Sequence, residues 1–197
     1  MTGVSDQPRP GGASPDEVGF REWVSYRAPV LRRKAYLLCG DWYAADDLVQ
    51  DALISLYTTW PRVARGNNID AYASRVLVHK FIDEKRRPWR RQHPTETVPE
   101  RSDPQAHEAF EVVDRRDGPL AAALATLPVQ QRAVLVLRYV DDLAVDEIAR
   151  VLDLPAGTVK SRLSRGIDAL RTQLETSGYS DASTASYAPS PGTEGPS

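Results

Sequence analysis

The sequence predicts an all-α fold made of two small helical domains that a flexible linker joins. Apolar residues recur every three or four positions along most of the chain, which is the spacing of one helix face. No segment alternates apolar and polar residues between two turn signals, so no strand is predicted. Residues 92–118 interrupt the helical pattern with three prolines, one glycine and seven acidic residues against three arginines.

The chain is predicted to divide into five segments. Residues 1–15 and 176–197 are rich in Pro, Gly, Ser and Thr. These two tails bury too little apolar area to offset the entropy of ordering, so both are expected to be disordered. Residues 16–91 and 119–175 are the two helical domains. Residues 92–118 are an acidic, extended linker between them.

Three helices are expected in the first domain. The first carries an apolar stripe from Phe20 to Leu38, in which Pro29 marks a kink or a break, and Gly40 ends it. The second spans about 44–59 and ends at a Trp-Pro pair. The third spans about 71–87 and also ends before a proline.

A helix-turn-helix is the strongest local signal of the second domain. A short helix at 145–152, a turn containing Asp153 and a longer helix after it follow that plan, and Asp tolerates the left-handed backbone of such a turn. With Ile148 and Val159 inward, six polar residues point outward: Thr158, Lys160, Ser161, Arg162, Ser164 and Arg165. Such cations and hydroxyls bind phosphates and read base edges. The alternative is a helical hairpin with a solvated basic face.

Two further surfaces carry opposite charge. Residues 75–91 contain seven basic and two acidic residues with Phe81 and Trp89 among them. Cations supply salt-sensitive phosphate contacts and aromatic rings stack on unpaired bases, although a solvated helix end has the same composition. The acidic helix at 41–60 is either a solvated face or a docking site for a basic protein.

Composition argues against several other classes of protein. The 197 residues contain no run of 18 apolar residues, so no membrane contact is expected. The N-terminal residues are not expected to act as a secretory signal. A cytoplasmic location is therefore expected. A single cysteine, Cys39, excludes an internal disulfide and is interpreted as a core residue. The three histidines are far apart and there is no Gly-rich phosphate loop, so no enzyme activity, metal or cofactor is predicted.

Four segments in this order resemble a known family. They are AYLLCGDWYAADDLVQDALISLYTTW (35–60), DAYASRVLVHKFIDEKRR (70–87), LPVQQRAVLVLRYVDDLAVDEIA (127–149) and LPAGTVKSRLSRGIDALR (154–171). Together they are similar to bacterial RNA polymerase sigma factors of the extracytoplasmic-function (ECF) class, of the actinobacterial type. The resemblance covers Val18 to Leu174.

The resemblance implies three sets of site residues. Core RNA polymerase would dock on Asp46, Asp47, Leu48, Gln50 and Asp51. The −10 promoter element would be recognised and melted by Arg65, Asn67, Asn68, Tyr72, Arg75, His79, Lys80, Arg86 and Arg87, with a flipped base held in a pocket. The −35 element would be read by the outward residues of the helix-turn-helix. The linker would thread toward the RNA exit path.

Three departures from the family pattern stand out. Pro155 stands where the −35 helix often begins with Ser, and Pro is acceptable in a first turn. His79 replaces the usual Asn at a position that helps to form the −10 base pocket. Ala144 replaces the usual Ser cap of the helix-turn-helix, which costs ~1 kcal/mol unless Asp142 or Asp146 substitutes.

The implied partners are core RNA polymerase and promoter DNA. An anti-sigma factor is a further candidate, because many relatives are held inactive by one that covers both domains. The rival interpretations are a stand-alone helix-turn-helix regulator, a nucleic-acid-modifying enzyme with a targeting domain, and a decoy that titrates an anti-sigma factor.

Overall fold

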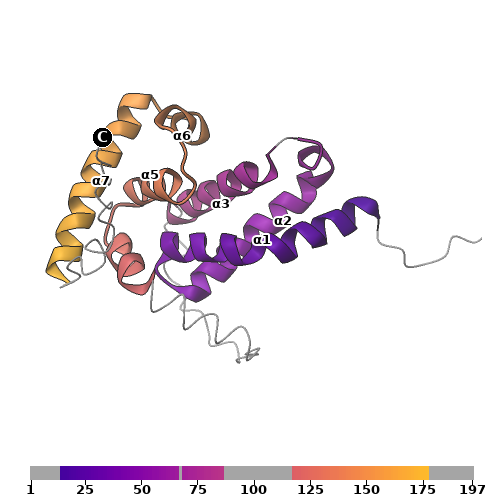
Figure 1. Ribbon diagram of the computed structural model, residues 1–197, viewed down its shortest axis with the longest axis horizontal. Helices are drawn as coiled ribbons and strands as arrows, with labels where there is room; N and C mark the ends of the chain where they lie inside the picture. The colour runs from indigo at the N-terminus through magenta and orange to yellow at the C-terminus, as the bar shows by residue number, and fades with distance from the viewer. Residues whose placement is uncertain (1–13, 67, 87–116, 178–197) are drawn as a thin grey trace, which may run out of the picture.

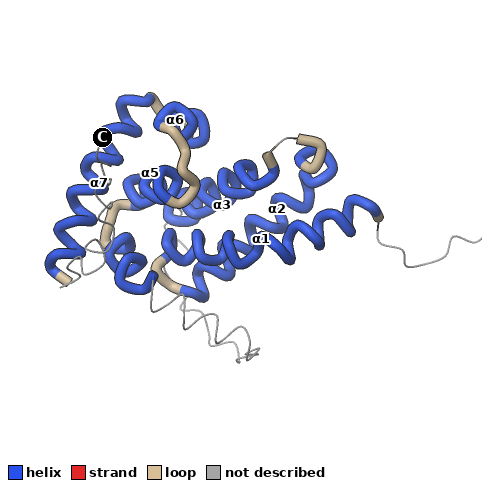
Figure 2. The backbone as a smooth tube through the Cα atoms, viewed as in Figure 1, coloured by secondary structure: helices blue, strands red, loops and turns tan. Residues whose placement is uncertain are grey.

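The computed structural model describes residues 14–66, 68–86 and 117–177. These residues are helical apart from short turns, with no strand among them (Figure 2), so the predicted all-α class is confirmed. Within the same ranges, no helix combines the length and the apolar character that crossing a bilayer requires. The predictions for residues 1–13, for the linker up to 116 and for 178–197 lie outside the described residues.

The first unit consists of three helices: α1 (Pro15–Cys39), α2 (Trp42–Val63) and α3 (Ile69–Arg86). Ser14 caps α1 by accepting a hydrogen bond from the backbone N–H of Glu17 at 3.2 Å. Gly40 ends α1 in a left-handed conformation, with φ of 75°. Asp41 then caps α2 through the backbone N–H of Ala44 at 2.8 Å, so the chain reverses between α1 and α2 in two residues.

Pro61 was wrongly predicted to end the second helix, and Pro29, predicted to mark a kink or a break, does not break the first. Pro29 lies inside a continuous α1, and Pro61 lies inside α2, which continues to Val63. Each proline ring is exposed to solvent. Beyond Pro61, Val63 still buries its side chain against the core. Packing on both sides of each proline therefore outweighs the lost backbone hydrogen bond.

The second unit contains a helical stretch at 117–125, followed by α5 (Val129–Tyr139), α6 (Val145–Leu152) and α7 (Ala156–Thr176). Residues 117 and 118, expected in the linker, are part of this helical stretch. Pro128 precedes α5 as its N-cap residue and lies outside the first turn. The predicted bounds of the short helix at 145–152 are confirmed.

The two units pack against each other around one continuous hydrophobic core. Figure 1 shows α5 beside α3, with α7 on the far side of α5. Phe81 of α3 and Leu137 of α5 are both fully buried in this core. The end of α1 also contacts α5. The arrangement of the site residues therefore depends on how the units are packed.

Candidate nucleic-acid and protein interfaces

The helix-turn-helix has the geometry that the sequence indicated. Asp153 takes a left-handed conformation with φ of 51°, and the backbone N–H of Leu154 donates to the carbonyl of Ala149 at 3.0 Å. Ile148 and Val159 are fully buried between α6 and α7. Gly166 lets α7 approach α5 closely, because a Cβ there would lie 3.1 Å from Cδ1 of Leu135.

No side chain replaces the missing Ser cap at Ala144, but Glu147 inside α6 makes a different hydrogen bond at the same helix end. The carboxylate of Glu147 accepts a hydrogen bond from the backbone N–H of Ala144 at 2.8 Å. This is one half of a capping box. Neither Asp142 nor Asp146, the substitutes considered from the sequence, makes this bond. Two acidic residues in the first turn, Asp146 and Glu147, also complement the helix dipole.

The predicted −35 residues lie together on the first three turns of α7. Lys160, Ser161, Ser164 and Arg165 are exposed, and Thr158 is half-buried. Arg162 differs, because its guanidinium donates to Oε1 of Gln130 on α5 at 2.8 Å. The exposed cations and hydroxyls form the basic face of α7. Gln130 was not predicted, since contact across the two helices has no signal in the sequence.

The predicted −10 residues occupy α3 and the loop before it. Tyr72, Arg75 and His79 share one face of α3, at a spacing of three and four residues. Lys80 is half-buried beside them, and Arg65 is exposed in the loop. Asn68 caps α3, because its Oδ1 accepts from the backbone N–H of Ala71 at 2.9 Å. Asn67, Arg87 and the side chain of Arg86 lie outside the described residues.

The face of α3 contacts the second unit at His79, whereas Arg75 on the same face is exposed. Nε2 of His79 donates to the backbone carbonyl of Val151 in α6 at 2.6 Å. Arg75 lines a cavity together with Glu147 and Arg150 of α6. The sequence predicted the composition of this face correctly but not its contacts with the second unit.

The predicted polymerase-docking residues lie on α2, with one exception. Asp46, Asp47, Gln50 and Asp51 are exposed. Leu48 is only 2% exposed and packs in the core, so its side chain does not belong to this face. The carboxylate of Asp46 pairs with the guanidinium of Arg32 on α1 at 2.7 Å.

Three large apolar side chains on α2 were missed by the sequence analysis. Tyr43, Ile54 and Tyr57 are 78%, 59% and 51% exposed. Helical spacing places them in one line with Asp47 and Gln50. We call these five residues the α2 stripe. The signal was available, because large apolar residues fall on the polar side of this amphipathic helix.

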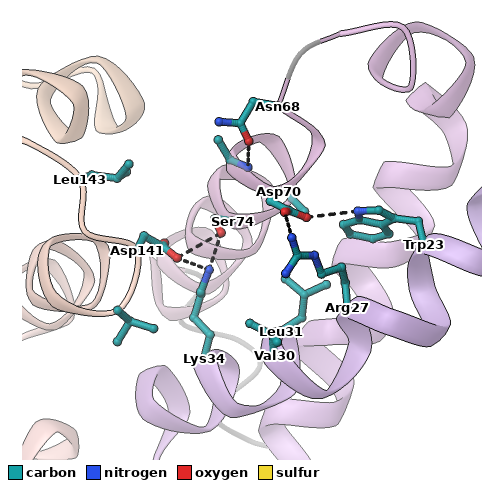
Figure 3. A pocket seen from close by; sticks show the side chains of 13 residues that line it. Trp23, Arg27, Val30, Leu31, Lys34, Asn68, Asp70, Ser74, Asp141 and Leu143 are labelled. Carbon is teal, nitrogen blue, oxygen red and sulfur yellow. Dashed lines mark hydrogen bonds and ion pairs between the residues drawn. The ribbon is translucent and has the colours of Figure 1, made fainter.

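A cavity of about 290 Å³ lies between α1, the start of α3 and the loop after α5 (Figure 3). On one wall, Asp70 pairs with Arg27 and accepts a hydrogen bond from Nε1 of Trp23 at 3.2 Å. On the other, Lys34 pairs with Asp141 and donates to Ser74. The first pair lies within the first unit, while the second pair joins the two units.

Titratable groups give no indication of nucleophilic or metal chemistry in the described residues. Burial raises the pKa of the Cys39 thiol to about 12, so the thiolate that a nucleophile requires is scarce at neutral pH. The interpretation of Cys39 as a core residue agrees with this environment. No cluster of His, Cys, Asp or Glu within the described ranges has the arrangement of a metal site.

Comparison with known proteins gives matches over both units. Residues 23–91 match the family model described as Sigma-70 region 2, and residues 118–170 match Sigma-70, region 4. The chain is 36% identical over 156 residues to an RNA polymerase sigma-E factor of Streptomyces avermitilis, which covers 79% of this chain and 85% of that one. It is 27% identical to the ECF RNA polymerase sigma factor SigW of Bacillus subtilis, over 81% of this chain and 90% of that one.

Two solved structures have a similar fold. One is the sigma factor RpoE in complex with the anti-sigma factor NepR from Bartonella quintana, with a TM-score of 0.58 and 23% identity over 80% of this chain and 97% of that one. The other is CnrH in complex with the cytosolic domain of CnrY, with a TM-score of 0.53 and 20% identity over 81% of this chain and 89% of that one.

Proposed function

The chain belongs to the RNA polymerase sigma factors of the ECF class, and we propose that three of its surfaces divide the work of promoter recognition. The observation that carries this proposal is their separation: an acidic and apolar stripe on α2, a mixed basic and polar face on α3, and a basic face on α7. Residues 16–91 and 119–175 are the proposed functional domains. A stand-alone regulator needs only the last of the three surfaces.

The α2 stripe is the proposed docking site for core RNA polymerase. Exposed apolar side chains beside carboxylates suit a basic, partly apolar partner, since the apolar groups supply affinity and the charges supply orientation. Asp47 and Gln50 of the stripe, with Asp46 and Asp51 beside it, provide the polar contacts, and Ile54 provides an apolar one. Leu48 contributes only by holding α2 in the core.

The face of α3 and the loop before it are the proposed contact for the −10 element. Tyr72 offers an aromatic ring for stacking on an unpaired base, and Arg75 and Lys80 offer charge to the backbone. His79 stands where the family pattern has Asn and provides one ring donor. The side-chain carbonyl of Asn68 is already used in capping α3, so only its amide group is left to donate to the DNA strand.

The basic face of α7 is the proposed reader of the −35 element. Its residues lie on the first turns of the second helix of a helix-turn-helix, which is the part that enters a major groove. Gln130 holds Arg162 at 2.8 Å and so limits the directions in which this arginine reaches for bases. The protein supplies no catalytic group of its own and works in the cytoplasm, where its polymerase is. An anti-sigma factor, such as those bound to the two structural neighbours, is a further candidate partner.

Run-off transcription tests the proposal. Core polymerase without sigma factor is supplied with genomic fragments, with and without this protein, and new discrete start sites are expected only with it. Asp47→Arg is expected to abolish them by preventing docking. Glu22→Arg, an exposed position on α1 outside the three surfaces, changes the charge equally and is expected to keep them. Absence of transcripts together with tight binding of the free protein to duplex DNA would favour a stand-alone regulator.

A further inference from the structure

We propose that Trp23, Arg27 and Asp70 are positioning residues for −10 recognition: they fix the first turn of α3, and with it two side chains that would meet an unpaired base. The inference rests on the proposed function of α3. Asp70 lies between Asn68 and Tyr72 at the start of this helix, and its carboxylate is bound from α1 (Figure 3). The three positioning residues are separate from the proposed DNA contacts and act through them.

Both oxygens of the Asp70 carboxylate have a donor on α1. Nε1 of Trp23 donates to Oδ1 at 3.2 Å, and the guanidinium of Arg27 donates to Oδ2. Trp23 and Arg27 are four residues apart, so they lie on one face of α1. Because each oxygen is bound by a different side chain, the carboxylate cannot turn without losing a bond. Asp70 therefore fixes the start of α3 to α1 in direction as well as in distance.

Trp23 also packs against the end of α2. Its ring centroid lies 5.8 Å from that of Trp60, and Phe20 approaches Trp60 edge-on at 5.2 Å. Trp60 is only 4% exposed and lies one turn before α2 ends. Trp23 thus contacts α2 just before the chain leaves it and α3 just after the chain enters it. Aromatic packing on one side and a hydrogen bond on the other hold these two helix ends at a set separation.

The turn that Asp70 fixes also carries two of the proposed −10 contacts. Oδ1 of Asn68 accepts from the backbone N–H of Ala71 at 2.9 Å, and its backbone carbonyl accepts from the N–H of Tyr72 at 3.3 Å. Asn68 and Tyr72 are therefore tied to the same turn as Asp70 and move with it. A binding site works when such supporting bonds lock the groups that touch the ligand. A rotation of this turn would displace the amide and the ring together.

The contact to α1 is poorly placed to serve stability alone. The side chains of Arg27 and Asp70 are 36% and 46% exposed, and ion pairs at such exposure contribute little to folding. An acidic residue in the first turn also suits the helix dipole, but that effect needs no partner on α1. Two donors aimed at the two oxygens of one carboxylate instead match a requirement for orientation.

Binding of intact and abasic strands by the holoenzyme tests the inference. The full chain is assembled with core polymerase and titrated with a fluorescent single strand from the non-template −10 region of a promoter mapped by transcription. Strands that lack one base at a time are compared with the intact strand. The position whose loss weakens binding most marks the base that is held. A base–aromatic stack contributes about tenfold to affinity, so we expect a clear preference of the wild type for the intact strand.

Two substitutions remove the contacts while keeping most of the bulk. Trp23→Phe keeps a ring against Trp60 and the charge of Asp70 but loses the Nε1 donor, and Asp70→Asn removes the charge that Arg27 binds. In each variant we expect the preference for the intact strand to fall by about threefold or more. Affinity for the abasic strand and for core polymerase, and the urea midpoint, are expected to change little. The double variant is expected to lose no more than Asp70→Asn alone, because both changes act through one carboxylate.

Arg21→Gln is the matched control. It removes a guanidinium that pairs with Glu17 within α1 and is 71% exposed, and it is expected to keep the wild-type preference. The same substitution type on the same helix therefore separates the contact to α3 from a general change of charge on α1.

Each outcome decides a different claim. A wild-type preference that both Trp23→Phe and Asp70→Asn retain would overturn the inference and leave the proposed −10 contact intact. A preference lost only in Asp70→Asn would assign the effect to the helix dipole, and equal weakening of intact and abasic strands would assign it to general structure; both results would overturn the inference, as would additive losses in the double variant. A wild-type protein without any base preference would overturn the proposed function of α3, and the inference with it.

Discussion

Gly40 offers a sharp test of both the local backbone and the packing of the two units. Its φ of 75° is left-handed, and a Cβ added there would lie 2.8 Å from Cβ of Ala125, in the other unit. In Gly40→Ala, the left-handed backbone costs ~1 kcal/mol. The close approach to Ala125 adds about 1 kcal/mol or more, as overpacking does. The expected loss in unfolding free energy is therefore about 2–3 kcal/mol.

A double-mutant cycle separates these two contributions. Ala125→Gly removes the methyl group that the new Cβ would meet, at a cost of about 0.5–1 kcal/mol for a glycine near a helix end. In the double variant the new Cβ at position 40 has no methyl group to meet, so Gly40→Ala costs only its backbone contribution there. We therefore expect the double variant to be about 1 kcal/mol more stable than the sum of the two single losses predicts. Urea denaturation followed by circular dichroism measures all four unfolding free energies.

The two results that refute this reasoning point to different errors. A loss below ~0.5 kcal/mol in Gly40→Ala would mean that residue 40 is not left-handed. A clear loss without any coupling to Ala125 would keep the local conformation but contradict the contact between the two units in solution.

Three further predictions concern other parts of the molecule. Ile54→Asp on the α2 stripe is expected to weaken binding to core polymerase by about tenfold or more, because it removes an apolar contact. Fluorescence titration of the protein with core polymerase measures this affinity. An unchanged affinity would exclude Ile54 from the interface. Asp153→Val is expected to lower the unfolding free energy by ~1–2 kcal/mol, since a β-branched residue fits the left-handed turn poorly. Asp153→Gly is expected to leave the unfolding free energy unchanged or higher. Equal losses in both variants would contradict the turn geometry. Cys39, with its thiol pKa raised to about 12, is expected to stay protonated and to resist iodoacetamide at pH 8 in the folded protein, but to react in urea. Mass spectrometry measures the label. Rapid labelling of the folded protein would contradict the burial of this thiol.

The local features of the fold were predictable because they depend on neighbours in the sequence. The bounds of α6, the left-handed Asp153 and the Gly40 stop follow from apolar spacing and from the few residues that accept such backbone angles. The helix end at Pro61 was wrongly predicted because it depends on packing rather than on sequence neighbours. Pro29 and Pro61 stay inside helices because the packing of each helix on its neighbours outweighs a local preference.

The candidate sites divide in the same way. Charge and polarity along α2, α3 and α7 were visible in the sequence, and helical periodicity sorted most residues onto the correct face. Leu48 was assigned to the docking face because the family resemblance implies a contact there. Its helical spacing, however, already placed it with the core residues Ala45 and Ala52. Tyr43 and Ile54 were overlooked although the same periodicity exposes them.

The amino-acid sequence alone was enough for the helices, the family and the composition of each surface, since these arise from residues within a few turns of one another. It carried no signal for the pairing of Lys34 with Asp141, for the carbonyls that Arg132 binds, or for the covering of His79 by α6. Those contacts join residues 72 to 107 positions apart. Their energy depends on burial and on the geometry of both partners, which exist only once the two units have packed together.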